Sequence, residues 1–306
     1  MHRKVHKIGS SLMISLPFEW VKANKLAAKE ELPVNIRESE LVISAREPSP
    51  IARFITISLN FDSDAFKRNP SFYLRSLLGS VYKLGFDTVR LTDVAEFLKS
   101  AIRKTCAQLI GFEIVDERGS TIVIRNLVKP SDAELEQLFR KQFHITDTIL
   151  ALLCEGIKSG KRDDDAAREY LLLLERTTDY TKRLTLEKNT ERYLLIWTFE
   201  KLARELVYLY TESDFKRMSV KIKNYLNSVF GYVGAVSDAV FSFDFKKTLA
   251  LQKEKDLLLY EQGPALFSRV GKMDVLALHH SMNVVRRSWD AVGPLILFSV
   301  KKMSAE

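Results

Sequence analysis

The sequence predicts a multidomain protein in which a small β-rich segment and a small α/β segment precede a long all-α segment. Three observations predict this order. Apolar residues recur with the strand period near the N-terminus, strand and helix patterns alternate between residues 51 and 128, and strand patterns disappear after Pro130. The chain has 306 residues, of which 46% are hydrophobic, and this is enough for more than one hydrophobic core.

Residues 1–47 are expected to form short strands around one short helix. In "SSLMISLP", apolar residues recur at every second position from Leu12, which is the pattern of a half-buried strand. Pro17 suits the first position of the helix in "FEWVKAN", and Asn24 can end that helix in the left-handed conformation. The stretch "LPVNIRESELVISA" predicts a second hairpin with a polar turn at "ESE".

Residues 51–128 are expected to form a small two-layer α/β domain. The stretches "RFITISL" and "DTVRL" have the composition of strands. The stretches "SFYLRSLLGSVYKLG" and "DVAEFLKSAIRKTCAQLIG" have the apolar spacing of helices that end at Gly85 and Gly111. A hairpin that turns at Arg118-Gly119 follows, so the predicted order is βαβαββ with an open sheet.

Residues 131–303 show helical patterns with few interruptions. The "SDAE" stretch from Ser131 is a capping box that would start the first helix. Glycine and proline residues are expected to divide the segment into a bundle of about six helices. These residues are Gly156, Gly160, Gly231, Gly234, Gly263-Pro264, Gly271 and Gly293-Pro294. The parts 131–213 and 215–300 have a similar length and rhythm, which hints at an internal duplication into three-helix halves.

The N-terminal 29 residues are strongly basic, with a formal charge of +5 in a chain whose net charge is +8. A solvated basic tail is the plain interpretation of this charge. A predicted hairpin favours a more specific one, because a tight turn at Gly9 would hold Lys7, Ser10 and Ser11 at one tip. Backbone amides, a lysine and hydroxyl groups can all donate hydrogen bonds to phosphate oxygens.

A unit of about 45 residues with short strands cannot bury enough apolar surface by itself. Two copies could close one β-barrel together. A twofold dimer of this kind would present two basic faces to a twofold DNA site. The segment is therefore expected to dimerise.

The stretches "RKVHKIGSSLMISLPFEWVKANKL" and "LPVNIRESELVISA" resemble the AbrB/MazE/SpoVT swapped-hairpin DNA-binding domain. The resemblance implies an intertwined homodimer, a swapped-hairpin β-barrel, that binds double-stranded DNA through its N-terminal strands and turns. The positions that it assigns to DNA contacts are Arg3, Lys4, His6, Lys7, Ser10 and Ser11. The family commonly has Gly-Asp before its second hairpin, where this chain has "KEELP".

The helical segment resembles the PhoU family of phosphate-uptake regulators, which consist of two related three-helix bundles. Archaeal proteins that join a swapped hairpin, an α/β segment and a PhoU-like bundle resemble this chain from end to end. The family marker is a pair of carboxylate motifs that bind metal clusters. At the matching places, "FEKLAREL" has Glu200 and Arg204, and "VVRRSWDAV" has Arg286 and Asp290. Because a guanidinium repels a cation, neither a metal nor another cofactor is expected here, and Glu200 and Arg204 are expected to form an i,i+4 ion pair.

Two further polar clusters have a structural and a functional interpretation. "KRDDDAARE" could recruit a metal through Asp163, Asp165 and Glu169, but carboxylates also suit the start of a helix, and that interpretation is preferred. The adjacent His279 and His280 of "LHHSM" cannot share one helix face, whereas a zinc protease needs histidines four residues apart. They are expected to be packing or surface residues.

The sequence favours a protein that is not an enzyme. It contains no Gly-x-Gly-x-x-Gly, no P-loop, no nucleophile elbow and no Cys-x-x-Cys, and it has only five histidines. Cys106 and Cys154 form no disulfide framework, which indicates a reducing cytoplasm. No apolar run approaches the ~20 residues of a membrane span, so no membrane insertion is expected.

These observations predict a DNA-binding transcriptional regulator, linked to phosphate uptake or homeostasis by the PhoU resemblance. It would bind operator DNA as a homodimer through its basic hairpins, with the helical segment as a sensor or interaction module. The alternative is a PhoU-type signalling adaptor that docks on a phosphate transporter or its regulatory proteins and uses the hairpin only to dimerise. Glu30 and Glu31, which lower the positive potential of the hairpin segment, favour this alternative.

Overall fold

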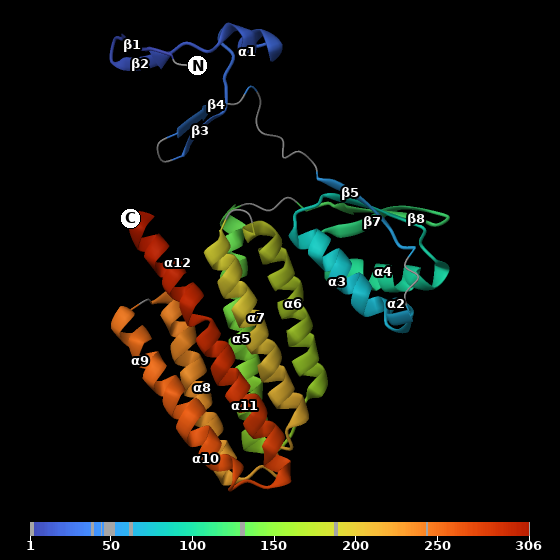
Figure 1. The fold of residues 1–306 in the computed structure, drawn as a ribbon, viewed down its shortest axis with the longest axis vertical. Helices are drawn as coiled ribbons and strands as arrows, with labels where there is room; N and C mark the ends of the chain where they lie inside the picture. The colour runs from blue at the N-terminus through green and yellow to red at the C-terminus, as the bar shows by residue number, and fades with distance from the viewer. Residues whose placement is uncertain are drawn as a thin grey trace. The chain divides into compact units, whose positions relative to one another are not determined.

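The computed structural model describes residues 3–37, 40–43, 45, 53–60, 64–128, 132–186, 189–242 and 244–305. The chain divides into two compact units, Met1–Arg53 and Phe54–Glu306. It is a mixed α/β protein with small N-terminal sheets, a mixed sheet with its helices, and a helical C-terminal region (Figure 1). The α/β segment and the helical segment, which the sequence assigned to domains 51–128 and 131–303, belong to the same unit.

The first unit contains strands and one short helix in the predicted order. Its elements are β1 (Val5–Ile8), β2 (Ser11–Ile14), α1 (Phe18–Ala23), β3 (Val34–Arg37) and β4 (Glu40–Ile43). β1 pairs antiparallel with β2, and β3 pairs antiparallel with β4. Residues 38 and 39 of the predicted "ESE" turn lie outside the described residues.

The end of α1 differs from the prediction by one residue. Asn24 has a φ of −93°, and Lys25 takes the left-handed conformation instead, with a φ of 55°. The Asn24 side chain donates a 2.9 Å hydrogen bond to the carbonyl of Trp20, which keeps Asn24 in the last helical turn. At the other end, Pro17 has an extended backbone and precedes the helix, since α1 begins at Phe18.

The α/β segment has the predicted βαβαββ order with one additional short helix. Its elements are β5 (Phe54–Ser58), α2 (Asp64–Arg68), α3 (Pro70–Lys83), β6 (Thr88–Thr92), α4 (Glu96–Gln108), β7 (Phe112–Arg118) and β8 (Thr121–Asn126). The described strands form a four-stranded sheet in the order β5-β6-β8-β7. Only β5 and β6 are parallel, and such a pair needs a crossover connection, which α2 and α3 supply.

The helices α3 and α4 cover one face of this sheet (Figure 1). Alternate strand residues point into that layer and are buried, among them Val89, Leu91, Ile122 and Ile124. Gly85 confirms the predicted end of α3, since it follows the C-cap Leu84 with a left-handed φ of 83° that glycine adopts without strain. α4 ends earlier than predicted, at Gln108, and Gly111, with a φ of 84°, lies in the turn between α4 and β7.

The remaining elements are helices. They are α5 (Asp132–Ser159), α6 (Asp164–Thr185), α7 (Thr190–Glu212), α8 (Val220–Phe241), α9 (Phe245–Asp256), the π-helix η1 (Leu257–Gln262), α10 (Gly263–Phe267), α11 (Lys272–Asp290) and α12 (Val292–Ala305). α7 packs against α5, α6, α11 and α12 and lies in the middle of the bundle (Figure 1). Among the described helices, none combines the length and the apolar run that a bilayer crossing requires.

Several glycines that were predicted to end helices lie inside them. Gly156 is within α5, and the ring of Phe215 packs where a side chain would be, with 2.7 Å between Phe215 Cε2 and the position of an added Cβ, so the packing requires a glycine there. Gly231 and Gly234 are within α8, whose other residues are mostly apolar and buried. Gly160, in contrast, follows α5 with a φ of 69°. Ser131 of the predicted capping box lies outside the described residues.

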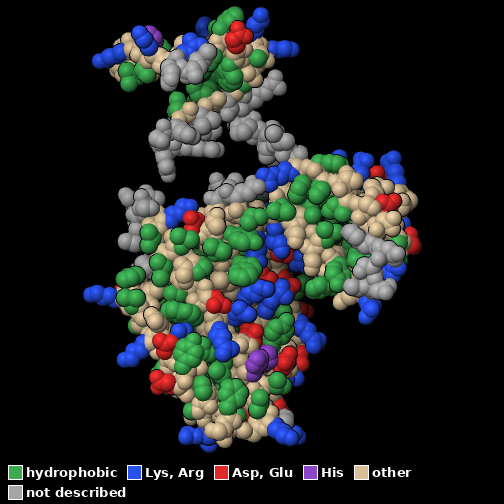
Figure 2. All heavy atoms as spheres, viewed as in Figure 1, with side chains coloured by type: hydrophobic (Ala, Val, Ile, Leu, Met, Phe, Trp, Pro, Cys, Tyr) green, Lys and Arg blue, Asp and Glu red, His purple; other side chains and the backbone are tan. Residues whose placement is uncertain are grey.

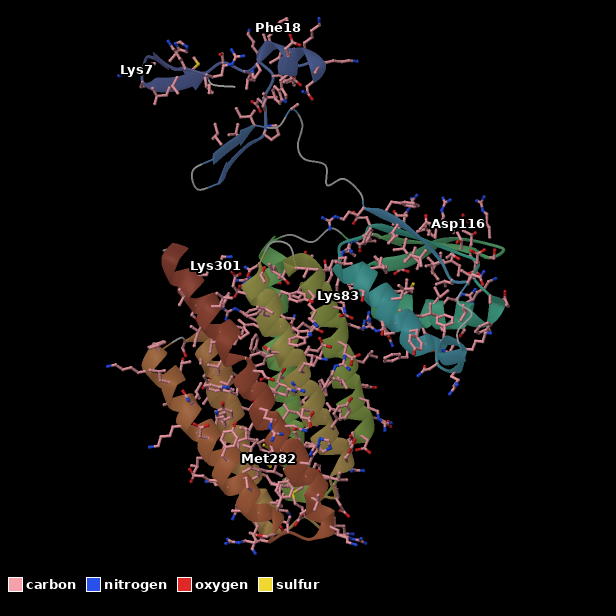
Figure 3. The ribbon with its side chains drawn as sticks, in the orientation of Figure 1. Lys7, Phe18, Lys83, Asp116, Met282 and Lys301 are labelled. Atoms are coloured by element: carbon pink, nitrogen blue, oxygen red, sulfur yellow. The ribbon has the colours of Figure 1, made fainter. Side chains whose placement is uncertain are left out.

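Charged side chains fasten the α/β segment to the bundle. Arg75 of α3 forms a 2.5 Å ion pair with Asp179 of α6, and Lys83 Nζ lies 3.6 Å from the same carboxylate. Arg183 of α6 donates hydrogen bonds to the carbonyls of Tyr82 (2.7 Å) and Phe86 (2.9 Å) at the end of α3. In Figure 3, the labelled Lys83 lies on α3 beside α6.

Candidate functional site

The basic hairpin of the first unit is a regular antiparallel pair with a tight turn. Val5 lies opposite Ile14, His6 opposite Met13, and Lys7 opposite Leu12. Gly9 follows β1 with a φ of 62°, so the predicted glycine turn is present. The labelled Lys7 lies toward the turn end of the hairpin in Figure 3.

All six residues predicted to contact DNA are exposed, but they divide between the two faces of the hairpin. They are Arg3, Lys4, His6, Lys7, Ser10 and Ser11. Residues that lie opposite each other, or two apart on one strand, share a face. Lys7 therefore shares the face of Leu12 and Ile14, whereas His6 shares the face of Met13 and Ser11. The strand alternation continues from β1, so it assigns Arg3 to the first face and Lys4 to the second.

Among the described residues of the first unit, none covers the apolar face of this hairpin. Leu12 is 74% exposed, Val5 61% and Ile14 47%. The hairpin β3–β4 has a similar face, with Val34 and Leu41 more than half exposed. Exposed hydrophobic side chains are visible over the first unit in Figure 2.

The described residues of the first unit form no hydrophobic core. None of its described residues is buried, and the helix α1 buries no side chain. A groove of about 310 Å³ lies in the loop region after α1, lined mainly by Leu16, Val21, Leu26 and Leu32. Glu30 is part of this loop, where its carboxylate accepts a 2.8 Å hydrogen bond from the amide of Ala27.

Comparisons with protein-family models, curated proteins and solved structures found no match for this chain.

In the second unit, Glu200 is buried and held by two cations. Lys182 of α6 contacts one carboxylate oxygen, and Arg204, one turn along α7, donates a 2.8 Å hydrogen bond to the other. The predicted i,i+4 pair of Glu200 and Arg204 is therefore present, and Lys182 is an additional partner. Arg204 also forms a 2.8 Å ion pair with Glu175.

The electrostatics of Glu200 follow from these neighbours. Burial acts to raise the pKa of its carboxyl, but the charges and hydrogen bonds of Lys182 and Arg204 outweigh burial and lower the pKa to about 2. Because each carboxylate oxygen already contacts a cationic side chain, neither is available to coordinate a metal ion.

The second pair of residues at the PhoU motif positions, Arg286 and Asp290, lies on α11. Asp290 forms a 3.2 Å ion pair with Arg287, and Arg286 donates a 3.0 Å hydrogen bond to the side-chain oxygen of Asn283. The structure does not bring Glu200 or Asp290 into a shared cluster of ligands. Across the described part of the chain, no group of three or more His, Cys, Asp and Glu side chains has the geometry to hold a metal ion.

The acidic stretch "KRDDDAARE" starts a helix, as preferred from its sequence. Asp163 is the N-cap of α6, and its side chain accepts a 3.0 Å hydrogen bond from the amide of Ala166. Asp165 in the first turn is exposed and lies 4.0 Å from Arg168.

The two adjacent histidines have different surroundings. His279 is exposed, whereas His280 is buried between two glutamates of α7. Its Nδ1 lies 2.6 Å from Glu205 and its Nε2 lies 3.1 Å from Glu212. The interpretation as packing and surface residues holds, but the carboxylate partners of His280 come from another helix and leave no signal near it in the sequence.

Proposed function

We propose that this chain is a DNA-binding transcriptional regulator that acts as a homodimer through its N-terminal unit. The observation that carries the proposal is the first unit itself, in which no described residue is buried and both hairpins expose one apolar face. A stable protein does not leave such faces in water, because burial of apolar surface is the main source of folding free energy. A second copy, with the same faces, is the partner that a twofold assembly supplies.

The face of β1–β2 opposite Leu12, which includes Met13, would remain outside such a dimer. Its polar side chains are His6 and Ser11, and Lys4 precedes them on the same side. These side chains, together with the turn at Gly9, can donate hydrogen bonds to DNA phosphates. Glu30, which weakens the positive potential, is engaged with the Ala27 amide in the loop after α1.

The helical region of the second unit is proposed as the sensor or interaction module. Its link to phosphate uptake or homeostasis rests on the resemblance of the sequence to PhoU proteins, as the swapped-hairpin barrel rests on the AbrB resemblance. A family-type metal site is not part of the proposal, because the cations Lys182 and Arg204 occupy the carboxylate of Glu200.

The test is fluorescence anisotropy of the full chain with a labelled duplex from the DNA upstream of its own gene, over a range of salt concentrations. Binding should fall steeply with salt, because each neutralised phosphate releases counterions. The triple variant Arg3→Ala, Lys4→Ala, Lys7→Ala should weaken binding while the dimer persists, and sedimentation velocity checks the dimer because Arg3 and Lys7 share the face of Leu12 and Ile14. The variant should also reduce the slope of log K against log salt by about 1 for each DNA phosphate that it no longer neutralises.

A matched control removes the same charge from the exposed surface of the second unit, at Lys216, Lys221 and Lys253. This control should bind DNA as the wild type does. If both triple variants bind DNA equally well, the assignment of the contacts is wrong. If the wild type dimerises but does not bind DNA at any salt concentration, the alternative of an adaptor with a hairpin used only for dimerisation is favoured.

A further inference from the structure

A pocket of about 530 Å³ lies where the π-helix η1 packs beside α11. The last residues of α9 and the π-helix contribute Lys255 and Tyr260, and α11 contributes Arg286, Arg287, Trp289 and Asp290. A π-helix is rare and frequently lies at a functional site, where the extra residue in its turn moves side chains out of the regular helical positions. The volume lies within the range of pockets that bind small molecules.

The pocket is positively charged. Lys255 forms a 2.6 Å ion pair with Asp256, and Arg287 forms a 3.2 Å ion pair with Asp290. Arg286 has no carboxylate within ion-pair distance among the described residues, and its Nη1 donates to the neutral side chain of Asn283. An exposed guanidinium without a carboxylate partner is well suited to bind a phosphate group through parallel hydrogen bonds.

Asn283 holds Arg286 in place. Its side-chain oxygen accepts the Arg286 hydrogen bond, and its side-chain nitrogen lies 3.2 Å from Glu205 and 3.1 Å from His279. Glu205 is in turn held by His280. The guanidinium is therefore positioned by a hydrogen-bonded chain that reaches from α11 to α7, so less entropy is lost when it binds a ligand.

Two aromatic rings complete the pocket. The ammonium of Lys255 lies 5.1 Å from the ring centre of Tyr260 and 4.9 Å from that of Trp289. This cation–π contact fixes both rings at the wall of the pocket. Tyr260 is 64% exposed, so the ring face that Lys255 does not cover is available to stack on a planar group.

We propose that this pocket binds a nucleotide, with the phosphate on Arg286 and Arg287 and the base stacked on Tyr260. Arg286, which has no carboxylate partner among the described residues, favours an anion, the exposed Tyr260 ring favours a planar group, and the volume suits a ligand that carries both. The proposal concerns residues of the second unit and does not depend on DNA binding by the first unit.

Isothermal titration calorimetry of the full chain with AMP tests this proposal, with inorganic phosphate and adenosine as partial ligands. AMP should bind at least about tenfold more tightly than either part, because it uses both the cations and the ring. Arg286→Ala and Tyr260→Ala should each weaken AMP binding by about tenfold or more. Both side chains are exposed, so both variants should melt at the wild-type temperature.

The control variant is Arg217→Ala, which removes an exposed arginine of the same unit that is distant in sequence and absent from the pocket lining. It should bind AMP as the wild type does. Trp289 gives a second readout, because AMP should quench tryptophan fluorescence in the wild type and not in Trp289→Phe. The proposal is overturned if AMP does not bind, if phosphate alone binds as tightly as AMP, or if Arg286→Ala and Tyr260→Ala leave the affinity unchanged.

Discussion

Lys182 of α6 and Glu200 of α7 form an ion pair inside the helical bundle, with both side chains at most 9% exposed. Removal of one member of a buried pair leaves an uncompensated charge, at a cost of about 3–5 kcal/mol. We expect Glu200→Gln to lower the free energy of unfolding by about this amount in denaturant titrations at pH 7. Asp214→Asn is the control, since it breaks the exposed pair with Arg217 and should cost less than about 1 kcal/mol. Equal losses in the two variants would contradict the prediction.

The lowered pKa of Glu200 leads us to expect that the free energy of unfolding decreases in acid. The pKa of Glu200 lies below its ordinary value of 4.5, at about 2, so the folded state favours the ionised form. Its contribution to stability, about 3 kcal/mol, is fully present above pH 4.5 and is lost as the pH falls from 4.5 toward 2. The difference in unfolding free energy between the wild type and Glu200→Gln should therefore shrink over this interval. A difference that stays constant down to pH 3 would show that Glu200 does not titrate in this way.

Arg183 of α6 connects the helical region to the end of α3, and its replacement should destabilise this contact. Its guanidinium contacts the carbonyls of Tyr82, Gly85 and Phe86 and forms a 2.8 Å ion pair with Asp87. Lysine cannot reach all these acceptors with one ammonium. We expect Arg183→Ala and Arg183→Lys both to speed amide exchange in residues 82–87, measured by hydrogen–deuterium exchange with mass spectrometry. Arg103→Ala breaks an exposed pair with Glu117 and should leave exchange in residues 82–87 unchanged.

The regular elements of the α/β segment could be predicted because their signals are local. Strand alternation and glycines such as Gly85 and Gly111, which suit left-handed positions, specify them without knowledge of the tertiary structure. The errors at helix ends have two causes. At Gly156 the close packing of Phe215 requires a residue without a side chain, so this glycine does not mark a helix end. After α1, the local bond from the Asn24 side chain to the Trp20 carbonyl keeps Asn24 in the last helical turn, and Lys25 is left-handed instead.

The buried charges could not be predicted from the sequence. The second half of α6 buries polar residues, including Thr178, Thr181 and Lys182, so hydrophobic periodicity does not mark its inner face. The partner of Lys182 lies on the next helix, and the sequence does not give the register between antiparallel helices. The π-helix η1 has only six residues and lies between α9 and α10, so it is too short to show a period in the sequence, and the pocket beside it could not be predicted either. At the N-terminus, the sequence identified the exposed basic residues but not how the register divides them between two faces.

The apolar face of the first hairpin should hold two copies of the chain together. We expect the double variant Leu12→Ser, Ile14→Ser to shift the chain from dimer to monomer, because it removes two largely exposed apolar side chains from the face that a partner would cover. Met13→Ser is the matched control, since Met13 lies on the opposite face of the same strand and is also exposed. Sedimentation velocity over a range of protein concentrations measures the change. Equal dimer populations in the two variants would exclude this face as the interface.

Lys4 allows DNA contact to be separated from dimerisation. The strand alternation places Lys4 with His6 and Ser11, away from Leu12. We expect Lys4→Ala to keep the dimer, weaken DNA binding and reduce the salt slope by about 1, because one DNA phosphate is no longer neutralised. Lys104→Ala, an exposed lysine of the second unit, should change neither property. The Leu12→Ser, Ile14→Ser variant should instead regain DNA affinity as its concentration rises, because mass action restores the dimer. If Lys4→Ala also dissociates the dimer, Lys4 belongs to the subunit interface and the DNA-contacting face must be sought elsewhere.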